Sequence, residues 1–349
     1  METQELNENA ETKKSEKIFI GVDFGTSKIS ITTSEGKNVL EQNVVGYPKD
    51  PISSKFLKKE VLYGKEAIKH RIALDIFRPI EHGTLKSNKE DIAAAKGLLE
   101  HCLKSIDLSD DVESYAILGV PAEASVLSKK ILTEISKDFI TSAIVANDPF
   151  CMAYELGELE NVLIVDIGAG TTDLCRVHGT LPEPADMLSW PKAGDHIDQT
   201  LIKLITEGYT DAMVTKEMAK RWKEQYAFVG KPQNDIKVDI PVDSSALELS
   251  ITQELKEACE SIVPDVITGI TQLISTYDPD FREELRNNII ISGGGSLIKN
   301  IDSYIEEELS IVGGGKVSAI KEDPFLAGSK GALKLAKDMP EDYWKQLIK

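Results

Sequence analysis

The 349-residue sequence lacks the patterns that mark several common classes of protein. Its four cysteines, Cys102, Cys151, Cys175 and Cys259, are scattered without a C-x-x-C pair. This spacing argues for reduced thiols and against a disulfide framework or a metal site. The five histidines show no metal-ligand spacing either. No apolar run approaches the length that spans a bilayer, so we expect no direct membrane insertion.

Clusters of basic residues are also missing, and the formal net charge is −18. Because a phosphate backbone is bound by clustered lysine and arginine, this charge argues against nucleic acid as a direct partner. Strong acidity suits a concentrated, soluble cytoplasmic protein. The first residues are polar and mostly acidic, and we expect residues 1–16 to form a disordered tail instead of a signal peptide.

The feature that organises the sequence is the stretch 162–175. An apolar run reaches Asp166, turns through Gly168 and Gly170 with Thr171 and Thr172, and continues as a second apolar run. This order predicts a strand, a tight turn and a second strand. Glycines let backbone N–H groups close on an anion and the hydroxyls add donors, so the turn suits a phosphate. A carboxylate repels phosphate but suits a hydrated Mg²⁺ that bridges to it.

A second copy of this pattern lies near the N-terminus, at residues 18–31. Asp23, Gly25, Thr26 and Ser27 stand in the same order between two apolar runs. Such a duplication predicts two similar domains that face each other across a cleft, although two unrelated hairpin turns are the simpler alternative.

A third glycine-rich element follows at residues 288–296, where an apolar strand leads into three glycines and Ser296. We expect a helix at about 297–309, whose N-terminus would offer unpaired N–H groups to a ligand. Turns of this kind also serve packing. None of the three elements matches a Walker A, Rossmann or G-x-S-x-G signature.

These three loops, in this order, resemble the actin, heat-shock-70 and sugar-kinase superfamily of ATPases over residues 17–349. Segments 78–83 (RPIEHG) and 223–230 (KEQYAFVG) are similar to segments of actin, and 193–198 (AGDHID) is similar to bacterial actins. Segments 46–50 and 343–347 resemble the magnetosome-aligning actins of magnetotactic bacteria.

The resemblance implies an α/β, actin-like fold with two similar domains around a nucleotide cleft. Domain I would comprise residues 17–157 and 325–349, with a small subdomain at about 49–77. Domain II would comprise residues 158–324, with a subdomain at about 193–265. The segment 343–349 would form a last helix that docks on its own domain, or else one that touches a partner or a membrane.

The resemblance also implies which residues would contact a bound ATP or ADP and its Mg²⁺ ion. Asp23 and Asp166 would orient the waters around the metal ion. The phosphates would be held by Gly25, Thr26, Ser27, Gly168, Ala169, Gly170, Thr171 and Thr172, and Lys28 would touch a phosphate or face solvent. The adenosine would lie between Lys223 and Glu224 on one side and Gly293, Gly294, Gly295 and Ser296 on the other. Gly194, Asp195 and Asp198 would lie near the ribose, or the two carboxylates would only stabilise a helix start.

Hydrolysis would depend on Asp148, Asp173 and Asp166. Asp148 precedes a proline where bacterial actins usually place glutamate and actin places glutamine. It would polarise the attacking water, but its shorter side chain reaches less far, so we expect slow hydrolysis. Asp173 matches a residue near that water, with capping of the local turn as the alternative.

The resemblance therefore implies a cytoplasmic ATPase that polymerises head to tail into filaments. Such filaments would position magnetosome organelles through adaptor proteins on a magnetosome or inner membrane. The alternatives are an MreB-like shape-determining actin, a plasmid-segregating actin, and a small-molecule kinase of the same superfamily.

Overall fold

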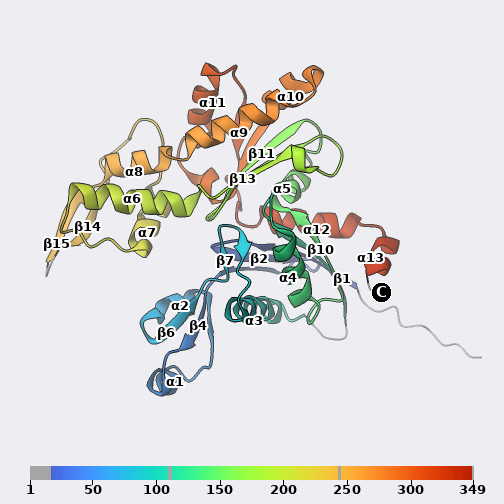
Figure 1. Cartoon of the computed structure of the whole chain (residues 1–349), viewed down its shortest axis with the longest axis horizontal. Coiled ribbons are helices and arrows are strands. Elements are labelled where there is room, and N and C mark those ends of the chain that lie inside the picture. Colours follow the sequence, from blue (N-terminus) through green and yellow to red (C-terminus); the bar gives the residue numbers. More distant parts are fainter. Residues whose placement is uncertain (1–16, 109–111, 243–244, 348–349) are drawn as a thin grey trace, which may run out of the picture.

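The computed structural model describes residues 17–108, 112–242 and 245–347 (Figure 1). The tail expected at 1–16 lies outside the described residues. Two five-stranded sheets form the centre of the chain, and helices cover both faces of each. All four cysteines are buried and have free thiols. Within the described ranges, no helix is both long and apolar enough to cross a bilayer.

The first sheet has the strand order β10-β9-β1-β2-β3. Strands β1 (Lys17–Phe24), β2 (Lys28–Thr33) and β3 (Asn38–Gln42) are successive antiparallel neighbours. β9 (Glu113–Val120) runs parallel to β1, and β10 (Ser142–Asn147) runs parallel to β9. The central strands are almost continuously buried because helices cover both faces.

The second sheet repeats this topology, with the order β13-β12-β11-β16-β17. Strands β11 (Val162–Ile167), β12 (Thr172–Val177) and β13 (Met187–Trp190) are again successive antiparallel neighbours. β16 (Ile289–Ser292) and β17 (Val317–Ala319) again run parallel to the first strand of the hairpin. The duplication predicted from the two Asp-Gly hairpins is confirmed at the level of the fold.

The helices divide between the sheet faces. On the first sheet, α3 (Lys89–Ser105) and α4 (Val126–Ser136) pack on the face that carries Ala116 and Leu118 of β9. The opposite face carries Tyr115 and Ile117, and α5 (Asp148–Leu156) and α12 (Ala327–Asp338) pack there. α5 also reaches the second sheet, where Phe150 and its neighbours contact β11 and β12. It is therefore packed against both sheets.

A smaller unit extends from each sheet (Figure 1). After β3 come β4 (Val45–Pro48), α1 (Pro51–Leu57), β5 (Leu62–Tyr63), α2 (Gly64–Lys69), β6 (Leu74–Phe77) and the hairpin β7 (Ile80–Glu81) and β8 (Thr84–Leu85). After β13 come α6 (Gly194–Gly208), α7 (Lys216–Tyr226), β14 (Lys237–Val242), β15 (Ser245–Ser250) and α8 (Thr252–Glu260). The remaining α-helices are α9 (Val263–Ser275), α10 (Arg282–Arg286), α11 (Ile301–Ile311) and α13 (Glu341–Leu347).

Two local predictions need correction or completion. The helix expected at 297–309 begins only at Ile301, because Gly294–Leu297 forms a 3₁₀ turn and Asn300 has a left-handed φ of 65°. The C-terminal helix docks on its own domain, since Trp344 is 3% exposed and its ring lies 5.4 Å from that of Tyr115.

The packing of α12 against α5 yields a stability prediction. A Cβ added at Gly331 would collide with the backbone carbonyl of Cys151 in α5, and a backbone group cannot move aside as a flexible side chain does. We expect Gly331→Ala to lower the free energy of unfolding by roughly 3 kcal/mol. Gly208→Ala is the matched control, because no atom lies within 4 Å of its added Cβ. Chemical denaturation of both variants tests this, and equal midpoints would contradict the close helix contact.

Candidate functional site

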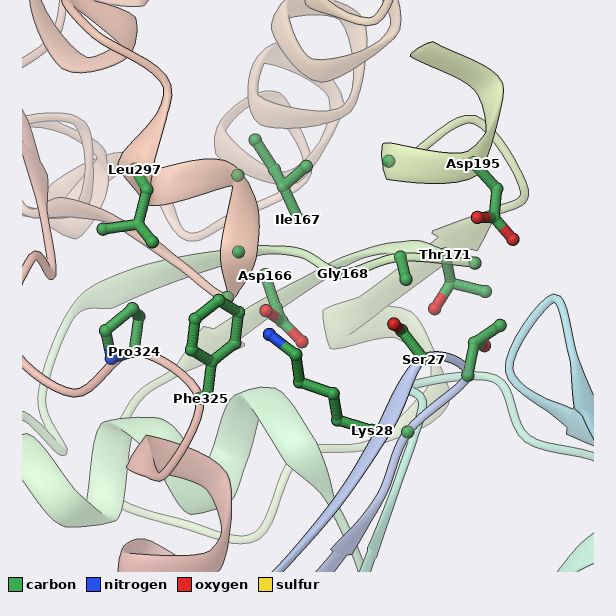
Figure 2. Close-up of a pocket in the computed structure, with 18 of the residues that line it drawn as sticks. Ser27, Lys28, Asp166, Ile167, Gly168, Thr171, Asp195, Leu297, Pro324 and Phe325 are labelled. Carbon is green, nitrogen blue, oxygen red and sulfur yellow. The ribbon is translucent and has the colours of Figure 1, made fainter. Parts of the chain in front are cut away.

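A cavity of about 510 Å³ lies between the two sheets, where the turns of the β1–β2 and β11–β12 hairpins face each other (Figure 2). Its size suits a ligand of a few hundred daltons. Almost all of the residues that the sequence predicts for the site line it. They are Asp23, Gly25, Thr26, Ser27, Lys28, Asp148, Asp166, Gly168, Ala169, Gly170, Thr171, Asp173, Gly194, Asp195, Asp198, Lys223, Glu224, Gly293, Gly294 and Gly295.

Thr172 and Ser296 are the exceptions, and neither lines the cavity. Side chains alternate along a strand, so Thr172 points away when Asp173 faces the cavity, and its hydroxyl donates to the Lys192 carbonyl over 2.7 Å. The Ser296 hydroxyl is buried and donates to the carbonyls of Gly293 and Ile320. Both hydroxyls therefore stabilise the loops around the cavity through bonds to backbone carbonyls and do not line the cavity themselves.

The two hairpin turns touch each other. A Cβ on Gly170 would collide with the side chain of Thr26, so a glycine is needed where the loops approach. The β7–β8 hairpin adds a connection to each loop. The Gly83 N–H donates to Thr26 Oγ1 over 2.9 Å, and His82 Nδ1 lies 3.4 Å from the Gly170 carbonyl oxygen. One short hairpin therefore contacts both turns.

Four aspartates converge at the base of the cavity. Asp148, Asp166 and Asp173 are 6%, 9% and 2% exposed, and Asp23 is half-buried. Burial raises the pKa of Asp23 to about 7. Burial, followed by the charges of the neighbouring aspartates, raises the pKa values of Asp148 and Asp166 well above the usual range. The pKa of Asp173 is also raised by burial, although hydrogen bonds to its carboxylate oppose the shift.

Hydrogen bonds hold two of these carboxylates in place. The Ala122 N–H donates to Asp173 Oδ1 over 2.9 Å, and the Ser292 hydroxyl lies 3.3 Å from Asp166 Oδ1. Asp148 Oδ1 has no hydrogen-bond partner although it is buried. A buried polar atom without a partner requires a water molecule or an ion.

The carboxylates fit a magnesium ion, because Mg²⁺ prefers oxygen ligands and keeps several waters. No cluster of three or more potential metal-ligating side chains was found among the described residues. The role expected for Asp23 and Asp166, to orient the waters around such an ion, stays a prediction.

Lysines stand opposite the carboxylates. Lys28 Nζ lies 3.2 Å from the centre of the Phe325 ring, and Figure 2 shows its ammonium between Phe325 and Asp166. Burial, together with the charges of nearby lysines, lowers the pKa of Lys28 to about 8. Lys28 thus points into the cavity. Of the two alternatives given for it, contact with a phosphate agrees better with this position than exposure to solvent.

Lys223 is engaged within its own half of the chain. Its Nζ lies 2.7 Å from Asp198 Oδ1 and donates to the Gly194 carbonyl over 2.6 Å. Asp198 is fully buried, and the ammonium group of Lys223 compensates the negative charge of its carboxylate. Asp195 lies in the first turn of α6, 3.2 Å from Lys216 Nζ. These pairings favour a structural role for both aspartates over a direct ligand contact.

The sequence reasoning missed several residues that line the cavity, among them Lys220 and Phe325. Lys220 lines the cavity and its Nζ donates to Ser27 Oγ over 2.7 Å. It lies one helical turn before Lys223, and that spacing would have placed it on the same face. Phe325 lines the cavity from the segment before α12, and no pattern in the sequence indicates it.

Comparison with known proteins places this geometry in a family. The model of the MreB/Mbl protein family matches residues 17–342. The actin-like protein MamK of Paramagnetospirillum magneticum is 37% identical over 332 residues, which is 95% of each chain. MamK of Magnetospirillum gryphiswaldense is also 37% identical, over 95% of this chain and 92% of its own. The cell shape-determining protein MreB of Escherichia coli is 22% identical over 89% of this chain and 91% of its own.

Solved structures agree with the sequence relatives. The chain matches a MamK double helical filament with a TM-score of 0.90 and 37% identity, over 93% of this chain and all of that one. A non-polymerising MamK mutant bound to AMPPNP gives a TM-score of 0.72 at the same identity and coverage. The fold, the duplicated hairpins and these matches lead to one conclusion: the chain belongs to the MreB/Mbl family of actin-like proteins.

Proposed function

We propose that this chain binds ATP or ADP with Mg²⁺ in the cavity between its sheets, hydrolyses ATP slowly, and polymerises into filaments. The observation that carries the proposal is the meeting of two equivalent Asp-Gly turns around one cavity. Its support from relatives is the family membership, the AMPPNP-bound MamK mutant and the MamK filament.

The turns would hold the phosphates. Both glycine turns line the space between them, together with Thr26, Ser27 and Thr171. Backbone N–H groups and hydroxyls of these turns would donate to the phosphates. Lys28 supplies a positive charge at the same place. A bound magnesium ion would neutralise the phosphate charge and the nearby carboxylates together. Met152 and Phe325 line the same cavity and help to exclude water.

Asp148 is positioned to orient the attacking water. It begins α5, and its Oδ1 packs against Gly119 of β9, where a Cβ would collide with it. Because phosphoryl transfer depends on positioning and electrostatics, a carboxylate that accepts a hydrogen bond from water is sufficient. Burial, followed by the charges of Asp23, Asp166 and Asp173, raises its pKa. A cation bound among these carboxylates would therefore help to keep Asp148 ionised for that bond.

Filament contacts would involve the small unit between β3 and α3. Ile52 and Phe56 of α1 are 80% and 71% exposed, and Ile72 is 88% exposed. Apolar side chains this exposed are typical of a surface that a second copy covers. By its greater identity to MamK than to MreB, we propose that the filament lies in the cytoplasm and positions magnetosomes through adaptor proteins. The domain limits given from the sequence remain predictions.

Sedimentation tests the proposal directly. The purified chain should pellet above a critical concentration with Mg-ATP, and that concentration should rise with Mg-ADP or without nucleotide. Released phosphate is read from the same samples. If the protein stayed in the supernatant under all three conditions, the filament proposal would be wrong. Small molecules would then be tested as phosphoryl acceptors.

Variants of Asp148 test its role in hydrolysis. Asp148→Asn keeps the shape, but its neutral amide is a weaker hydrogen-bond acceptor than a carboxylate and cannot take up a proton, so phosphate release should fall by about 100-fold. Asp148→Glu should raise the rate severalfold, because one more methylene extends the carboxylate toward the phosphates. The affinity for ATP, measured with a fluorescent analogue, should change little. If the Asn variant hydrolysed ATP at the normal rate, Asp148 would not be the water-orienting residue.

The raised pKa of Asp23 predicts a dependence of stability on pH. Its pKa is about 7 in the folded chain and 3.8 as an ordinary carboxyl. The stability that its proton provides is therefore fully present below about pH 4 and is lost as the pH rises through about 7. The melting temperature of the metal-free protein should fall across this range, and less so in Asp23→Asn.

In the unmodified chain, Mg²⁺ should reduce this fall in melting temperature, because it compensates the charge of the carboxylates. Asp211→Asn, which removes an exposed carboxylate, serves as the control for net charge. If the melting temperatures of the unmodified chain, Asp23→Asn and Asp211→Asn fell equally with rising pH, the raised pKa of Asp23 would be contradicted.

A further inference from the structure

Helix α7 presents a charged face to the first half of the chain. Glu217, Lys220 and Glu224 are three and four residues apart, so they share one side of the helix. Lys220 and Glu224 line the cavity. Arg221 lies between them in sequence but is exposed.

Each residue of this face meets a group from the other side of the cavity. Glu217 Oε1 lies 3.8 Å from Arg78 Nη2, just before the β7–β8 hairpin. Lys220 Nζ donates to Ser27 Oγ, in the turn between β1 and β2. The charge of Glu224 acts on Lys28, the next residue of that turn.

The contact of Lys220 is the strongest of the three. The Arg78 and Glu217 side chains are 43% and 42% exposed and barely within ion-pair distance, so their pairing contributes little. The Lys220 side chain is 29% exposed, and its hydrogen bond is charge-assisted and short at 2.7 Å. It also joins α7 directly to the turn that would hold the phosphates.

We propose that Lys220 is a positioning residue that fastens the β1–β2 turn to α7 and so holds the two halves of the site together around the nucleotide. This inference rests on the proposed nucleotide site. Since Ser27 belongs to the turn that would hold phosphates, bound phosphates and the Lys220 contact favour the same closed arrangement. Binding of nucleotide and closure of the cleft then strengthen each other.

The test compares Lys220→Ala, Lys220→Arg and Arg221→Ala in the full chain. The dissociation constant of a fluorescent ATP analogue with Mg²⁺ is measured below the concentration at which polymer forms. Lys220→Ala should weaken binding by roughly tenfold, as expected for one charge-assisted hydrogen bond. Lys220→Arg should recover most of the affinity, since it keeps the charge and the reach. Arg221→Ala removes the same charge from the same helix and should change the affinity less than about twofold.

Hydrogen exchange of a peptide that contains residues 23–31 provides the local readout. It should speed up in Lys220→Ala and stay unchanged in Arg221→Ala, while the melting temperatures of the variants stay equal. If the unmodified chain binds ATP but Lys220→Ala and Arg221→Ala behave alike, the role of Lys220 is overturned and the proposed function stands. If the unmodified chain binds no nucleotide, both fall together.

Discussion

Repulsion between buried carboxylates is the constraint on which the site depends. Asp23, Asp148, Asp166 and Asp173 converge where burial raises all of their pKa values. The folded chain therefore holds the ionised carboxylates at a cost that protonation or a nearby positive charge relieves. The cavity supplies part of that charge from lysines, and a metal ion with phosphates would complete the balance. A site that is electrostatically incomplete alone is well suited to respond strongly to its ligand.

The backbone delivers these groups by using one arrangement twice. In each sheet an antiparallel hairpin lies beside two parallel strands, and its turn opens toward the other sheet. Because Gly170 allows the turns to touch and the β7–β8 hairpin contacts both, neither turn can move without affecting the other. The site is thus one connected unit despite its assembly from distant segments.

Much of this arrangement could be predicted from the sequence, because apolar runs ending in Asp and Gly encode both the strands and the turns. Asp23 and Asp166 followed directly from that pattern, whereas Asp148 and Asp173 were implied only by the family resemblance. The outward direction of the Thr172 side chain could not be predicted in this way. Which side chains of a strand face the cavity depends on the residue at which β12 begins. Ser296 was misjudged because the expected helix is a 3₁₀ turn there. Phe325 enters the site through the tertiary position of its segment, which no local pattern records.

The position of α12 has a consequence for the order in which the chain can fold during synthesis. This helix lies directly on β1, where a side chain at Gly21 would collide with its backbone, and it also packs on α5. The sheet that is synthesised first thus lacks one of its covers until residues 327–338 have left the ribosome. The second sheet needs no strand from beyond residue 319. The sheet that is synthesised earlier is therefore the one that must wait, with part of one apolar face open, until the segment after the second sheet has been made.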